Sequence, residues 1–126
     1  MRIPPNVISF YTGAPLGEVP EYEDRRGRRV TFRAFLKHSG AVVDVDGEQT
    51  VFGFVIHYTI GLRRNECCHR AIWNKWSISE PITGMRVAYG ASRRNALFNL
   101  ALLVALHGGA EKFEAQIQQS VAAFKK

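Results

Sequence analysis

Two adjacent cysteines followed by a histidine, Cys67-Cys68-His69, are the residues of this sequence that most resemble a metal-binding or reactive group. Zinc takes four ligands in a tetrahedron, and two cysteines separated by two residues are the usual start of such a site. The adjacent cysteines here have no second pair to complete a site, even with His57 added. We therefore expect ordinary thiols, no bound metal and, because two cysteines make no disulfide framework, no secreted scaffold.

Nucleophilic catalysis by either thiol would require His57 or His69 to meet it in space, together with a group that orients the histidine. Glu66 and Asp44 have suitable side chains, but nothing in the sequence places them there. The eleven glycines follow no phosphate-binding pattern of the Walker or dinucleotide type. The sequence thus predicts no catalytic residue, no cofactor and a protein that is not an enzyme.

The composition is that of a basic globular domain. The chain has 126 residues, of which 46% are apolar and 22% charged, and its formal net charge is +6. Such a charge indicates a partner that is nucleic acid, a nucleoprotein or an acidic protein surface. A soluble protein that is basic without any such partner explains the charge equally well. The N-terminus lacks the apolar run of a signal peptide, and the apolar run 96–106 is too short to span a bilayer. We expect a cytoplasmic protein without a membrane contact.

Apolar and polar residues alternate from residue 29 to residue 37, which indicates a strand with one buried face. Two further strands are predicted over 41–45 and 51–60. Asp46-Gly47 between them predicts a tight hairpin turn, because both residues tolerate the positive φ angles of a type I′ turn.

The next part of the chain predicts two more strands, over 72–78 and 85–89, joined by a turn at Pro81 and Gly84. Before the first strand, Gly and Pro recur too often for regular structure. We therefore expect residues 1–28 to form an irregular arm.

The C-terminal third predicts two helices. Ser92 has the side chain of an N-cap, and Gly108-Gly109 would stop the helix near His107. A last helix over 110–124 carries a single apolar stripe. Because residues 96–106 are apolar nearly all round, we expect the last helix to cover what the sheet leaves exposed, with a homodimer through 96–106 as the alternative.

Strands followed by helices indicate an α+β fold. We expect one domain, residues 1–126, with an antiparallel meander sheet of about five strands and two C-terminal helices packed on one face.

Basic residues are the best candidates for binding a partner. If the apolar residues of 29–37 face the core, Arg33 lies on the opposite face of the sheet, where Lys75 and Arg86 can join it. Basic and aromatic side chains on a sheet can clamp phosphates and stack bases, or they can bind an acidic protein. A solvated sheet face explains them equally well. The predicted partner-binding residues are Arg33, Lys37, Arg63, Arg64, Trp73, Lys75, Arg86, Arg93 and Arg94.

The start of the first predicted helix carries two cations, Arg93 and Arg94, at its positive end. They oppose the helix dipole, so we expect an anion or a carboxylate to compensate them. The segment from Gly90 to Ala96, which follows two strands, resembles the last part of double-stranded-RNA-binding domains, and HicB-type antitoxins are similar in their strand-strand-helix pattern. The resemblance to the RNA-binding domains implies that Arg93 and Arg94 touch phosphates.

The chain as a whole resembles the short accessory proteins of phages and other mobile elements, anti-CRISPR proteins among them. That resemblance implies a non-enzymatic inhibitor that covers a functional surface on a host defence nucleoprotein complex. The alternative is a nucleic-acid-binding module that uses the basic sheet face and the Arg93-Arg94 helix start. The expected partner is accordingly a host protein or nucleoprotein complex, or nucleic acid itself.

Overall fold

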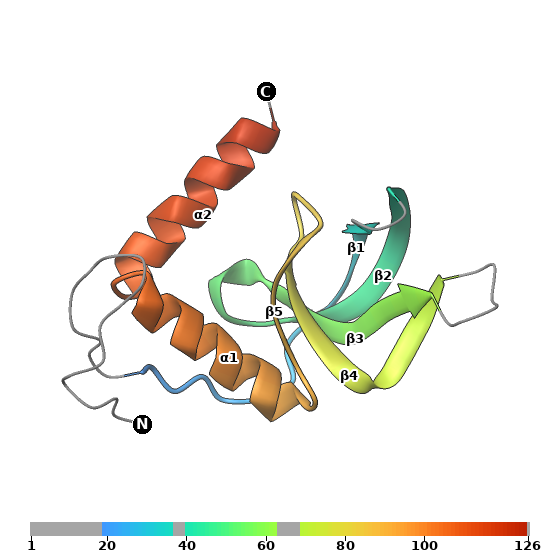
Figure 1. The fold of residues 1–126 in the computed structure, drawn as a ribbon, viewed down its shortest axis with the longest axis horizontal. Helices are drawn as coiled ribbons and strands as arrows, with labels where there is room; N and C mark the ends of the chain where they lie inside the picture. The colour runs from blue at the N-terminus through green and yellow to red at the C-terminus, as the bar shows by residue number, and fades with distance from the viewer. Residues whose placement is uncertain (1–18, 37–39, 63–68, 126) are drawn as a thin grey trace.

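The computed structural model describes residues 19–36, 40–62 and 69–125. Five strands, joined in one place by a short 3-10 turn, are followed by two helices (Figure 1). The strands form one antiparallel sheet in the order β1-β2-β3-β4-β5. This confirms the predicted α+β class and its meander sheet. The elements are β1 (Arg29–Leu36), β2 (Ala41–Gln49), η1 (Val51–Gly53), β3 (Val55–Leu62), β4 (His69–Glu80), β5 (Met85–Gly90), α1 (Arg93–Leu106) and α2 (Ala110–Phe124).

Each face of the sheet contributes to an apolar cluster. On one face, which we call the helix face, Ile56 and Ile78 pack against α1. On the other, the inner face, Phe32 of β1 packs with Val45 and Val55. The sheet is strongly curved, so that β1 and β5 approach each other although they are the first and last strands in the sheet order. Adjacent residues of β3 thus serve two separate apolar clusters, as the period of two along a strand requires.

The predicted hairpin turn at Asp46-Gly47 is wrong, because both residues lie within β2 and pair with β1. Gly47 has a different physical role. A Cβ on Gly47 would lie 2.5 Å from Cγ1 of Val55 and 2.7 Å from the carbonyl oxygen of Ile56. The glycine is therefore required for the close approach of β2 to β3.

The chain reverses at η1 instead, in residues that the sequence placed inside a strand. Phe52 adopts a φ of 62°, which is uncommon for a residue with a bulky side chain. Its ring packs against Tyr22, Phe54 and Phe113, with centroid separations of 5.9, 5.6 and 5.5 Å. We infer that this aromatic packing stabilises the strained turn.

The helix α1 begins and ends as predicted. The Ser92 hydroxyl accepts a hydrogen bond from the Asn95 backbone N–H at 3.0 Å, and Gly108 and Gly109 follow the helix with positive φ angles of 91° and 111°. The buried residues that α1 contributes to the core on the helix face are Ala96, Leu97, Leu100 and Val104.

The helix α2 leaves α1 at an angle, so that the two helices form a V (Figure 1). Phe113 and Ile117 of α2 belong to the core on the helix face. Leu102 and Leu106 of α1 remain partly exposed. The expected cover of α1 by the last helix is therefore partial, and the homodimer stays a prediction. Within the described residues, no helix has the length and apolarity to cross a bilayer.

The described part of the predicted arm, residues 19–28, contains no helix or strand. It is nevertheless attached to the core. Val19 is buried, Tyr22 packs edge-on against Phe52, and the carbonyl oxygen of Arg28 accepts a hydrogen bond from the Gln49 N–H at 2.7 Å. This attachment brings Asp24 to the start of α1.

Candidate functional site

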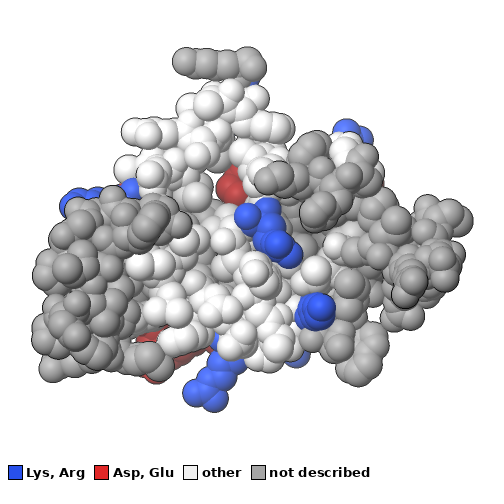
Figure 2. Space-filling view, in the orientation of Figure 1, with Lys and Arg blue, Asp and Glu red and all other residues white. Residues whose placement is uncertain are grey.

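The structure separates the predicted basic residues. Arg33 pairs with Asp44 of β2. Asp44 lies on the same side of β2 as Glu48, which pairs with Ile56 of the helix face, so Arg33 belongs to the helix face. Arg86 lies opposite Ser79, which pairs with Val55 of the inner face. Arg33 and Arg86 are thus on opposite faces, contrary to the shared face that the sequence predicted. Figure 2 shows basic groups on this side of the molecule that are separated by uncharged surface.

Lys75 is exposed on β4, close to the point where the pairing of β3 with β4 shifts register. The backbone of Trp73 also belongs to β4, but its side chain is not among those that the structure describes. The other candidates lie outside the described residues: Lys37, Arg63, Arg64, Cys67 and Cys68.

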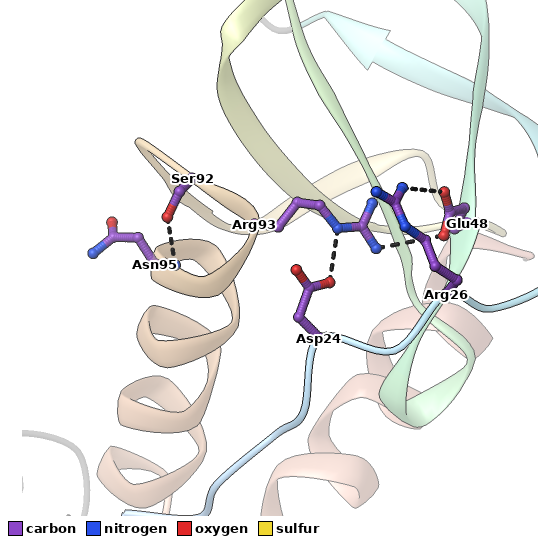
Figure 3. Close-up of polar contacts among 6 residues, drawn as sticks. All are labelled: Asp24, Arg26, Glu48, Ser92, Arg93 and Asn95. Atoms are coloured by element: carbon purple, nitrogen blue, oxygen red, sulfur yellow. Dashed lines mark hydrogen bonds and ion pairs between the residues drawn. The ribbon is translucent and has the colours of Figure 1, made fainter.

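The side chain of Arg93 is buried in an ion-pair network (Figure 3). Its Nε donates to Asp24 Oδ1 at 2.7 Å, and its Nη2 lies 3.4 Å from Glu48 Oε2. Arg26 donates to the other oxygen of Glu48 at 3.1 Å. The guanidinium of Arg93 also lies over the Trp76 ring, 5.0 Å from its centroid. Two carboxylates of the chain therefore provide the compensation that the helix start was predicted to need.

Arg94 has a different environment from its neighbour. Its side chain is exposed, and it makes no ion pair with any residue of the described chain. Only one of the two arginines at the helix start is thus available to an external anion.

The β4–β5 hairpin carries three of the exposed large apolar residues of the described chain. Ile82, Met85 and Tyr89 are 50%, 47% and 60% exposed. The guanidinium of the exposed Arg86 lies over the Tyr89 ring, 4.3 Å from its centroid, which is cation–π geometry. Arg86 makes no ion pair among the described residues. The strand pairing places Arg86 and Tyr89 on one side of β5 and Met85 on the other. We call Ile82, Met85, Arg86 and Tyr89, which together expose both sides of the hairpin, the hairpin surface.

A β-bulge places Arg86 over Tyr89. In a regular strand, residues three positions apart point to opposite faces. Here Ile78 of β4 pairs with Ala88 of β5, but the next residue, Ser79, pairs with Arg86, so β5 has one extra residue. The sequence singled out Arg86 by its charge but missed Ile82, Met85 and Tyr89, because the bulge and the exposure of β5 are not visible in the local pattern.

The end of β5 is fixed to α1. The side-chain amide of Asn99 donates to the Tyr89 carbonyl oxygen at 2.7 Å. A Cβ on Gly90 would lie 2.5 Å from Asn95 Oδ1, so only glycine allows the strand to approach the helix start this closely. Asn99, the polar interruption in the apolar run of α1, thus holds the strand that carries the hairpin surface.

His57 and Ser79 form a buried pair on the inner face. Because Nδ1 of His57 lies 2.6 Å from the Tyr58 carbonyl oxygen, Nδ1 carries the proton and Nε2 accepts from the Ser79 hydroxyl at 2.8 Å. Burial lowers the pKa of His57; its hydrogen bond to Tyr58 opposes this shift, and the charge of Arg86 adds to it. Both side chains are almost inaccessible to solvent, at 5% and 2% exposure, so this pair stabilises the sheet. The described residues include no group of three or more His, Cys, Asp or Glu side chains placed to hold a metal ion.

Comparison with known proteins gives no match: no family model matches the sequence, no curated protein is significantly similar to it, and no solved structure matches the fold.

Proposed function

We propose that this protein is a non-enzymatic binding protein that docks on a partner protein through the hairpin surface. One observation carries the proposal: the hairpin is exposed on both of its sides, with Arg86 and Tyr89 on one side of β5, Met85 on the other, and Ile82 in the adjoining turn. Single exposed apolar residues are normal on a soluble protein, whereas a group of them marks an interaction site. Arg, Met and Tyr are also the residue types enriched at the centres of protein interfaces.

A domain that docks in this way can act by covering a functional surface of its partner. The specific form that we propose is inhibition of a host defence nucleoprotein complex, as the resemblance to anti-CRISPR proteins implies. In this proposal the hairpin surface contacts a protein component of that complex.

Direct nucleic-acid binding is the second candidate. The exposed Arg28, Arg29 and Arg94 support it. However, affinity for nucleic acid grows with the number of phosphates that are neutralised together. The basic groups on the side of the molecule drawn in Figure 2 are separate, and Arg93 is already neutralised by carboxylates of the chain. These observations favour a protein partner.

The proposal is tested by comparing variants in capture from nuclease-treated host lysate. Met85→Ala/Tyr89→Ala truncates the hairpin surface, and Val42→Ala/Phe124→Ala is the matched control, since Val42 and Phe124 are 57% and 59% exposed elsewhere. We expect a stoichiometric partner with the wild type and the control, and its loss with the hairpin variant. Equal capture by all three proteins would contradict the proposal. A shift of duplex RNA or DNA that Arg94→Ala abolishes and the hairpin variant leaves intact would favour the second candidate instead.

A further inference from the structure

We propose that the hairpin surface recognises a carboxylate on the partner protein, the side chain of an Asp or Glu next to an apolar residue, and that Arg86 binds it. This inference rests on the proposed function, because it names what the same surface binds. The partner chemistry follows from the state of Arg86 and from its neighbours.

Arg86 is held in position, and no carboxylate among the described residues pairs with it. Cation–π attraction keeps its guanidinium over the Tyr89 ring, at 4.3 Å from the centroid. The N–H groups lie in the plane of the guanidinium, so a group that rests on a ring face keeps an edge for two parallel hydrogen bonds to a carboxylate. Four other arginines of the described chain have a carboxylate partner within the molecule: Arg25, Arg26, Arg33 and Arg93. Arg28, Arg29 and Arg94 have none among the described residues, but unlike Arg86 they are not held over an aromatic ring there.

The neighbours of Arg86 distinguish a carboxylate on a protein from a phosphate on nucleic acid. Tyr89 lies on the same side of β5 as Arg86 and is 60% exposed, so an apolar residue of the partner can pack beside its ring. This packing would exclude water from the ion pair and so strengthen it. A nucleic-acid backbone would instead require several basic side chains in a row, and Arg86 is the one basic residue between Trp76 and Gly90. The net charge of +6 complements an acidic partner and opposes self-association through this surface.

The probe for the test is a random peptide library displayed on phage, selected against the immobilised full-length chain. We expect the selected peptides to contain Asp or Glu beside a large apolar residue. When these peptides are synthesised and titrated, Arg86→Gln should weaken binding by about tenfold or more, the usual effect of losing a charged hydrogen-bond partner. Arg86→Lys keeps the charge but loses the planar fork, so it should recover only part of the affinity. Arg94→Gln, the matched control at another exposed arginine, should bind as the wild type does.

Failure of this inference can be distinguished from failure of the proposed function. Peptides that lose binding to Met85→Ala/Tyr89→Ala, but bind Arg86→Gln as well as the wild type, overturn the carboxylate inference and leave a hairpin docking surface in place. Peptides that bind the hairpin variant unchanged contradict the proposed function as well. A library that yields no Arg86-dependent peptide overturns the inference. The inference is also overturned if duplex DNA or RNA binds the wild type and Arg86→Gln abolishes that binding. Because Arg86 is exposed, its variants should keep the wild-type unfolding temperature, which shows that they fold.

Discussion

Replacing Arg93 by methionine would remove a cation from between two carboxylates while keeping an apolar stem of similar length against Trp76. Removing one partner of a buried ion pair costs about 3–5 kcal/mol, because the remaining charge is left uncompensated. Here the cost is reduced, since Glu48 keeps its contact with Arg26 and the side chain of Asp24 is 36% exposed. We therefore expect Arg93→Met to lower the free energy of unfolding by about 2–3 kcal/mol. This corresponds to a fall in melting temperature of about 6–15 °C for a domain of this size.

Arg94→Met is the matched control, because Arg94 occupies the next position of the same helix with an exposed side chain. Its effect on the free energy of unfolding should stay within about 0.5 kcal/mol, with a small gain from removing a cation at the positive end of the helix. Urea denaturation of both variants measures the difference. Glu48→Gln completes a double-mutant cycle and should show a coupling with Arg93 of about 1 kcal/mol or more. Equal stability of Arg93→Met and Arg94→Met would refute the conclusion that Arg93 is held inside the molecule by these carboxylates.

Three further predictions concern the elements around the hairpin surface. Gly90→Ala should destabilise the protein by about 1–3 kcal/mol in urea denaturation, because its Cβ would lie 2.5 Å from Asn95 Oδ1. Asn99→Ala should lower the free energy of unfolding by about 1 kcal/mol, because the hydrogen bond to the Tyr89 carbonyl is lost. NMR should show the largest changes in backbone chemical shift at the end of β5. Stability should fall with acidification below about pH 6.5, because His57 takes up a proton at its ordinary pKa in the unfolded chain but only at a lower pH when folded. His57→Gln should make the free energy of unfolding less dependent on pH between about 6.5 and the lowered pKa; an unchanged slope would mean that His57 is not buried in its neutral form.

The sequence by itself determined the order of the five strands and two helices, because the signals for these are local. Alternation around Phe32 indicated β1, and the hydroxyl of Ser92 and the glycine pair after His107 marked the ends of α1. The same local reasoning failed at Asp46-Gly47. A glycine required by a turn and a glycine required by a neighbouring strand look identical in sequence, and only the position of β3 tells them apart.

The candidate site depended on tertiary structure to a greater degree. Arg93 and Arg94 are the same residue type in adjacent positions, but successive residues point about 100° apart around a helix. This rotation directs one of them to Asp24 and Glu48, which are 69 and 45 residues away in the chain, and the other to solvent. Arg86 likewise meets the Tyr89 ring only because pairing with β4 forces a bulge in β5. The residue types that can bind a partner were visible in the sequence, whereas their availability was decided by contacts with residues far away in the chain.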